Sequence, residues 1–328
     1  MSGRAGSITP DTPEQGCPTA CLVATTNTDA RSQVREQKAA GRSMTTPRSS
    51  SSARGGSGQR RRVDHRSLVR IRDDLSAHHQ AVLDWLLAHR YATTHQLRAA
   101  CFAETGRSDV ATARATTRAL RRLEDAGLIR PLQRRVGGLQ AGSAVGIYQL
   151  TPGGYRVAGG TAGRFRSHEP SPRLLGHWLA IGDVQVALQG IAAQVGVQVE
   201  PASWRRYTGL GGETKWLQPD LAVVLHGRDA DGVYESRWFI EVDLGTEGFG
   251  RLERKALGYE TYLRTGIEQE RHGVFPLVLW LFAGETNRDG RRQARFASLV
   301  ERSSRLTTPL HRTATPDDLL DALRGGLA

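Results

Sequence analysis

Cysteine is scarce in this chain of 328 residues, which has only Cys17, Cys21 and Cys101. A structural zinc site normally needs four ligands, and no CxxC pair or paired histidine pattern completes one here. The odd and sparse set of cysteines favours a reducing, cytoplasmic compartment.

Long apolar runs are also missing. No stretch approaches the roughly 18 apolar residues that a membrane span needs, and the N-terminus lacks the basic-then-apolar order of a signal peptide. We therefore expect no association with a membrane. Lysine is rare as well: among 45 basic residues only Lys38, Lys215 and Lys255 are lysines. Arginine dominance mostly reflects coding bias and does not argue for nucleic acid, but it makes the positions of the few lysines worth following.

The net charge of +12 is unevenly spread along the chain. Residues 1–65 carry a net charge of +5, residues 66–166 carry +9, and residues 167–328 carry −2. A basic first half suits a polyanionic partner, most often nucleic acid. We therefore expect double-stranded DNA to be the partner of the first half.

The first 65 residues are rich in Ser, Thr, Gly and Arg, as in "RSSSSARGGSGQRRR". Such a composition cannot bury enough apolar surface to offset the entropy lost on ordering, so we predict a disordered basic tail over residues 1–65. Met44 lies inside this segment and is an alternative start.

Residues 66–160 predict a winged helix-turn-helix domain. Three helices are expected, at 75–90, at 93–103 after a Thr93 cap, and from a Ser108 cap to the C-cap Gly127. Two strands, "IRPLQRRV" and "GIYQLT", follow and are joined by the glycine-rich "GGLQAGSA"; together they form the expected two-stranded wing. A basic linker at 161–172 leads to the second half.

Residues 173–328 predict a separate α/β domain, which makes the chain α+β overall. The expected order is helix, three strands, helix and strand, followed by two further helices. The ranges are 174–194, 197–205, 220–226, 236–244, 250–264, 275–282, 289–303 and 316–324.

One face of the third helix is basic. Arg114, Arg118 and Arg121 fall at i, i+4 and i+7, opposite the core positions Leu120 and Leu123. Arginine on such a face can fork onto guanine edges or phosphates. Arg134 and Arg135 in the wing are placed to meet backbone phosphates. The alternative is a winged helix used for protein contact, with its arginines simply solvated.

The second half ends an apolar run with an acidic cluster, "FIEVDLGTE". If the preceding hairpin is centred on Asp231-Gly232, Asp220 faces Asp243 and Glu241 faces Ala222. Asp220, Glu241 and Asp243 then converge on one face, where like charges repel unless a cation is bound. We expect Mg²⁺ or Mn²⁺ there, because Mg²⁺ is commonly held by carboxylates.

This order of elements, with "PD" (Pro219-Asp220) opening one strand and an acidic pair ending the next, resembles the PD-(D/E)XK nuclease core. The resemblance implies a restriction-endonuclease-like αβββαβ fold in which Asp220 and Glu241 hold a divalent metal. The lysine expected two residues after the second acid is replaced by Asp243, a departure from the pattern. Lys255 on the following helix is the candidate replacement, since some members recruit the lysine there, and Lys215 is a weaker one. The alternative is that Lys255 serves only as a counter-ion.

The whole arrangement resembles the replication-relaxation family of plasmid and conjugative-element proteins. The residues that carry this resemblance are "LEDAGLIRPL", "HWLAIGDVQVAL", "PDLAVVL", "FIEVDLGTE" and "KALGYETYL", spread over about residues 75–285. It implies DNA binding tied to replication or transfer of a mobile element, with relaxase or replication proteins of the element as partners.

Three functions remain open from the sequence. The first is a non-catalytic accessory factor, which the aspartate at the expected lysine position favours. The second is a metal-dependent DNA endonuclease using Asp220, Glu241, Asp243 and Lys255. The third, a transcriptional regulator, leaves the carboxylates unexplained. His177 and Asp183, on the helix at 174–194, border the acidic face in one interpretation, but Trp178 and Leu179 make a plain core helix sufficient.

Overall fold

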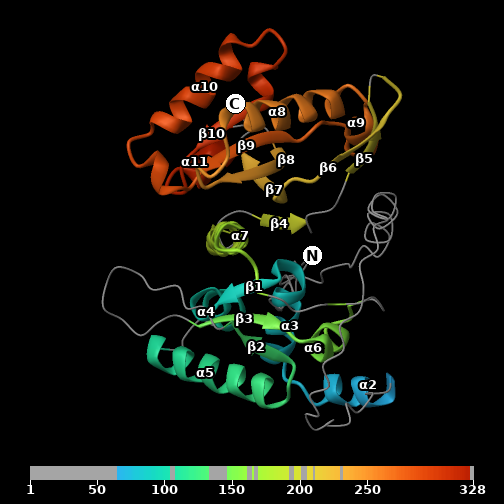
Figure 1. The fold of residues 1–328 in the computed structure, drawn as a ribbon, viewed down its shortest axis with the longest axis vertical. Helices are drawn as coiled ribbons and strands as arrows, with labels where there is room; N and C mark the ends of the chain where they lie inside the picture. Colours follow the sequence, from blue (N-terminus) through green and yellow to red (C-terminus); the bar gives the residue numbers. More distant parts are fainter. Residues whose placement is uncertain are drawn as a thin grey trace, which may run out of the picture.

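The computed structural model describes residues 65–103, 108–132, 146–160, 165, 169–191, 196–200, 205–209, 211–229 and 232–325. Within them the chain is a mixed α/β protein, α+β overall, as predicted (Figure 1). Apart from His65, the tail predicted to be disordered lies outside the described residues, as does most of the expected linker. Arg134 and Arg135 of the expected wing lie outside them too.

The first part of the chain contains five helices and three short strands among its described residues. They are α2 (His65–Asp73), α3 (Ala77–His89), β1 (Tyr91–Thr93), α4 (Thr94–Phe102), α5 (Asp109–Asp125), β2 (Ile129–Pro131), β3 (Ile147–Leu150) and α6 (Pro152–Val157). The three predicted helices are confirmed as α3, α4 and α5. The sequence reasoning missed β1, and also the short helices α2 and α6.

Local capping explains where α4 and α5 begin. The Thr93 hydroxyl accepts a hydrogen bond from the Gln96 backbone N–H at 3.0 Å, and the Gln96 side chain accepts one from the Thr93 N–H at 2.9 Å. This reciprocal pair is a capping box, which satisfies two backbone donors that the helix itself leaves unpaired. Ser108 caps α5 by accepting from Ala111 N–H at 3.3 Å. Both predicted caps are confirmed.

The three strands of this part form one antiparallel sheet in the order β1-β3-β2. Tyr91 pairs with Gln149, and Ile129 pairs with Leu150, so β3 lies between the two strands that precede it in the chain. The apolar sides of α3, α4 and α5 share a core with this sheet, in which Val82, Leu97 and Leu123 are fully buried.

Helix α7 (Pro172–Ile191) lies between the two parts of the molecule (Figure 1). Leu175 and Leu179 pack with Tyr91 and Ile147 of the first sheet. Its other side packs into the core of the second sheet, a contact made by Ile181, Val184 and Leu188. A helix that is apolar around most of its circumference is buried on several sides, and α7 joins the two cores in this way.

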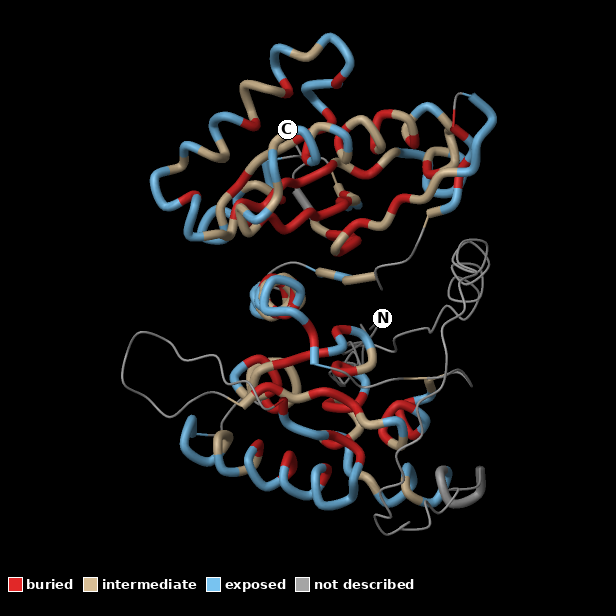
Figure 2. Tube along the Cα trace, viewed as in Figure 1, coloured by how far each residue is buried: buried red, intermediate tan, exposed pale blue. Residues whose placement is uncertain are grey.

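The second part is built on a five-stranded mixed sheet in the order β10-β9-β8-β7-β4. Its strands are β4 (Gly196–Glu200), β7 (Leu221–Asp229), β8 (Gly232–Asp243), β9 (Leu277–Phe282) and β10 (His311–Ala314). β9 runs parallel to both β8 and β10, whereas β4, β7 and β8 pair antiparallel. Figure 2 shows that the central strands of this sheet are buried, whereas the edge strand β4 is not.

Helices cover both faces of this sheet. One face packs against α8 (Phe249–Leu263) and α10 (Arg291–Arg302), and the other against α7 and α11 (Leu319–Arg324). Because both faces are covered, β9 (LVLWLF) is a continuous apolar run rather than an alternating one, and the last six residues of β8 are all buried. Phe239 faces α8, while its neighbours Trp238 and Ile240 face α7.

The predicted order of elements needs additions. The strands β4, β7, β8 and β9 and the helix α8 match the expected pattern. The structure adds a separate two-stranded sheet, β5 (Arg205–Thr208) with β6 (Thr214–Leu217), which splits the strand expected at 197–205. It also adds α9 (Ile267–His272), β10 and two short 3₁₀ turns, Glu285–Asn287 and Thr308–Leu310.

The predicted register of the β7–β8 hairpin is wrong by two residues. Asp229 pairs with Gly232, and Ala222 pairs with Phe239 rather than with Glu241. Gly232, at φ 134, is therefore the first paired residue of β8 and not part of the turn centre. Since side chains alternate with a period of two, a shift by two leaves every residue on its expected face.

In the residues that the structure describes, no helix is long and apolar enough to cross a membrane.

Candidate functional site

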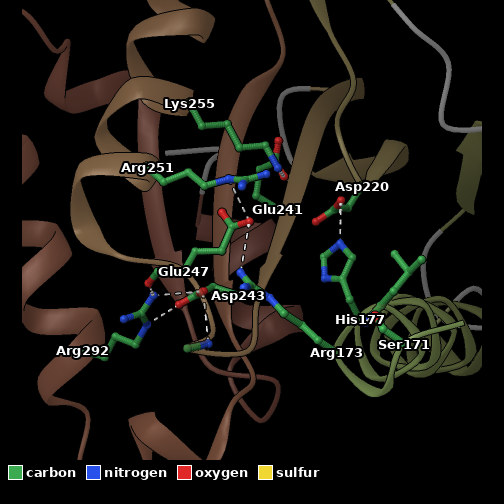
Figure 3. Close-up of polar contacts among 12 residues, drawn as sticks. Ser171, Arg173, His177, Asp220, Glu241, Asp243, Glu247, Arg251, Lys255 and Arg292 are labelled. Carbon is green, nitrogen blue, oxygen red and sulfur yellow. Dashed lines mark hydrogen bonds and ion pairs between the residues drawn. The ribbon is translucent and has the colours of Figure 1, made fainter. Parts of the chain in front are cut away.

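The predicted acidic residues lie where β8 ends and β7 begins. Glu241 and Asp243 are the last inward-facing polar residues of β8, and both are almost fully buried. Asp220 directly precedes β7 and lies beside Glu241 (Figure 3). The site is therefore a cluster of buried charged side chains at one end of the central strand β8.

Glu241 is held by two side chains of α8. The Lys255 ammonium donates to Oε2 of Glu241, and the Tyr259 hydroxyl donates to Oε1. Lys255 and Tyr259 are four residues apart, one turn on the same helix face. Tyr262, seven residues after Lys255, donates instead to buried Glu268.

Burial raises the pKa of Glu241 to about 8. The charge of Lys255 opposes this shift because it favours the carboxylate, whereas the charge of Asp220 adds to it. Burial by itself would lower the pKa of Lys255, but the negative charges of Glu241 and Asp220 outweigh it and raise that pKa above its ordinary value. Lys255 is thus a firmly protonated cation against two carboxyl groups.

Asp220 is held by one contact from α7 and one from the backbone of β8. Its Oδ1 lies 3.2 Å from Nε2 of His177 on α7, and its Oδ2 accepts from the Val242 N–H at 2.8 Å. Burial would raise the pKa of Asp220, but the His177 hydrogen bond and the nearby charge of Lys255 lower it below its usual range. Asp220 is therefore a carboxylate at neutral pH.

Asp243 points to a different partner. Arg292 of α10 donates to the Asp243 carboxylate through both Nε and Nη2, the latter at 3.1 Å. The Gly245 N–H also donates to this carboxylate, at 3.1 Å. Gly245 has a φ of 75, and a Cβ there would lie 1.7 Å from Oγ1 of Thr286, so this tight turn requires glycine. Asp243 thus forms a forked ion pair of its own, beside the contacts of Glu241 with Lys255.

More exposed charges surround this cluster (Figure 3). The Glu247 carboxylate forms ion pairs with Arg251 at 2.9 Å and with Arg173 at 3.8 Å. Its backbone carbonyl accepts a hydrogen bond from Arg292 at 2.6 Å. Arg173 and Arg251 are 57% and 67% exposed, so these outer ion pairs are largely solvated. Such exposed pairs contribute about 0–1 kcal/mol each and act mainly as surface charge.

The side chains present do not fit a divalent ion held by three carboxylates. Each oxygen of Asp220, Glu241 and Asp243 already accepts from a protein donor. Within the described ranges, no group of three or more His, Cys, Asp or Glu side chains is placed to hold a metal ion. The Lys255 ammonium lies beside Glu241, where a metal cation would otherwise be expected. The predicted Mg²⁺ or Mn²⁺ site stays a prediction.

The second candidate surface is the outer side of α5. Arg114, Arg118 and Arg121 are all exposed, and the buried positions Leu120 and Leu123 lie on the other side of the helix. In the part of the chain that the structure describes, no hydrogen bond or ion pair engages these three guanidinium groups. Their charges face solvent.

Sequence reasoning missed or undervalued several side chains of the buried site. His177 was set aside as a residue of a core helix, yet it contacts Asp220. Arg292, 49 residues from Asp243, carried no local signal. Asp183 contacts Gln96 of α4 at 2.7 Å and not the acidic cluster. Lys215 pairs with Glu213 at 2.6 Å on the surface, away from the site.

Fold and site together define an α+β protein that combines an arginine-faced helix with a buried cluster of carboxylates and a lysine. The chain belongs to the replication-relaxation family: its sequence matches that family over residues 83–278, more than half of its length. Neither a curated protein nor a solved structure matches the chain.

Proposed function

We propose that this protein binds double-stranded DNA through α5 and acts in the replication or transfer of a plasmid or other mobile element. The observation that carries the proposal is the row of exposed arginines on α5, at positions 114, 118 and 121, which no described residue engages in a hydrogen bond or ion pair. Family membership supports the biological setting. In that setting the protein works in the cytoplasm with relaxase or replication proteins of the element.

The arrangement around α5 supports a winged helix-turn-helix over residues 66–160. Helix α4 precedes α5, and β2 and β3, which pair with each other, lie in the two strands expected to form the wing. In that class of domain the second helix of the motif enters the major groove and the first crosses the backbone. Helix α5 is the recognition helix, and Arg134 and Arg135 would meet phosphates from the wing.

The second part, residues 173–328, acts in this proposal as a nuclease-like core used for binding rather than cutting. The contact of Lys255 with Glu241 supports this role, because an internal cation neutralises the carboxyl group that a metal would otherwise bind. Three polar contacts among the described residues join the two parts: Gln96 donates to the Leu179 carbonyl and to Asp183, both at 2.7 Å, and His89 lies 2.7 Å from Gln185. The DNA-binding part is therefore joined directly to α7.

Fluorescence anisotropy of a labelled DNA duplex tests this function. The full chain is expected to bind at low salt, with an affinity that falls steeply as salt rises, because bound arginines release counterions from phosphates. Absence of binding at low salt would contradict the proposal. A winged helix used for protein contact predicts that outcome.

A metal-dependent endonuclease is the second candidate, favoured by one specific observation. Lys255 reaches Glu241 from α8 beside Asp220, as expected if this lysine replaces the one missing from the strand. Incubation of supercoiled plasmid with Mg²⁺ or Mn²⁺, against an EDTA control, separates the two functions. We expect no cleavage. Nicking that disappears in both the Glu241→Gln variant and EDTA would establish the nuclease instead.

A further inference from the structure

An apolar strip lies beside the arginines of α5. It consists of Val110, Ala113 and Thr117, at i, i+3 and i+7, which we call the α5 strip. Val110 is 61% exposed, among the most exposed large apolar side chains of the described residues. Together with Arg114 and Arg118, the α5 strip lines one shallow, open depression on the helix surface.

The α5 strip offers methyl groups and a single hydroxyl. The Thr117 hydroxyl donates to the Ala113 carbonyl at 2.9 Å, so its only proton is used within the helix, and its methyl group adds to the apolar surface. Val110 and Ala113 have no polar side-chain atoms. The strip is therefore a narrow hydrocarbon surface framed by two cations.

The fold gives no structural reason for this surface. The side of α5 that packs into the core is formed by other residues, namely Thr116, Ala119, Leu120 and Leu123. A solvent-facing helix surface is ordinarily polar, and an exposed valine on it contributes nothing to the core. The surface is therefore suited to an occupant from outside the chain.

The framing arginines decide which occupant fits. An apolar protein or lipid surface would cover the methyl groups but leave Arg114 and Arg118 desolvated and unpaired, which is costly. The DNA major groove presents both complements: the C5-methyl group of thymine, and acceptor atoms on guanine and phosphate. An acidic protein surface would offer both complements too, but the net charge of +9 on residues 66–166 favours a polyanion, and the test below separates the two.

We propose that the α5 strip reads thymine methyl groups in the major groove, while Arg114 and Arg118 bind neighbouring guanine or phosphate acceptors. This inference rests on the proposed DNA binding. The strip lies in the N-terminal half of α5, the part of a recognition helix that contacts base edges. Its seven-residue span is about 10 Å along the helix axis, so it covers a step of roughly three base pairs of B-DNA.

The test uses two alternating duplexes of equal length, poly(dA-dT) and poly(dA-dU), which differ only in the thymine methyl group. The full chain is expected to bind the thymine duplex more tightly, by about fourfold for each methyl group contacted. In the double variant Val110→Ser with Thr117→Ser the ratio of the two affinities should approach one, while affinity for the uracil duplex changes little. Val233→Ser, which alters a 72% exposed valine on β8, is the matched control and should keep the parent's ratio.

The outcomes separate the two claims. Equal binding of both duplexes by the parent overturns the thymine reading and leaves DNA binding by α5 intact. A preference for thymine that persists in the double variant also overturns it, because the preference then comes from DNA shape or from other residues. If the parent binds neither duplex at low salt, both the inference and the proposed function fail.

Discussion

Replacing Lys255 with methionine is expected to lower the free energy of unfolding by about 3 kcal/mol at pH 9, where Glu241 of the parent is ionised. This is the low end of the cost of removing one partner from a buried ion pair, because the Lys255 side chain is 32% exposed. Methionine fills a similar volume, so the loss reports the charge and not a cavity. Glu241 is only 2% exposed and would keep just the Tyr259 hydroxyl as a close donor. Urea denaturation followed by tryptophan fluorescence measures the change.

Lys215→Met is the matched control for this variant. Lys215 also forms an ion pair, with Glu213, but the two side chains are 42% and 48% exposed. Exposed pairs contribute about 0–1 kcal/mol, so this variant should remain close to the parent. The double variant Lys255→Met with Glu241→Met should recover most of the lost stability, because an apolar pair replaces the charges. A Lys255→Met protein as stable as the Lys215→Met control would show that the pair is not a buried unit.

The cost of Lys255→Met should also grow with pH. The folded-state pKa of Glu241, about 8, lies above its ordinary value of 4.5, so its contribution to stability is complete below pH 4.5 and is lost as the pH rises through 8. Without the cation the pKa rises further, and the loss continues to higher pH. Denaturation at pH 6 and pH 9 should therefore show a wider gap between variant and parent at pH 9.

Replacing Arg114, Arg118 and Arg121 with alanine is expected to weaken DNA binding on the order of 100-fold or more, since each base or phosphate contact contributes about 1–3 kcal/mol. Alanine favours helix and the three side chains are exposed, so α5 should remain folded. The matched control removes three exposed arginines at the opposite end of the molecule (Figure 1), through Arg288→Ala, Arg291→Ala and Arg302→Ala. It loses the same charge but should keep nearly all of the affinity. Equal losses in the two variants would mean that net charge, and not α5, is responsible.

Much of this fold follows from local sequence signals. Thr93 and Ser108 mark helix starts because their hydroxyls satisfy backbone donors that the helix leaves free. The long apolar run ending at Asp243 predicts a central strand, and its period of two places Glu241 and Asp243 on the same side. That placement survives the error in register, because a shift of two residues preserves the face.

The sequence does not predict which side chain pairs with each buried carboxylate. Arg292 lies on α10, and its pairing with Asp243 depends on how that helix packs on the sheet. The sequence did not predict the contact of His177 with Asp220, because the residues around His177 are apolar. Helix α7 is buried against both parts, so its sequence resembles that of a plain core helix. The β5–β6 hairpin and β10 are short, and too few residues alternate in them to predict a strand.

The most direct test of DNA binding through α5 is the slope of log Kd against log salt concentration, measured for the parent and the triple arginine variant on one duplex. If all three arginines bind phosphates, the variant's slope should be shallower by about 2.7, because each phosphate contact contributes about 0.9. The control variant should keep the parent's slope. Identical slopes and affinities for the parent and the triple arginine variant would contradict the account.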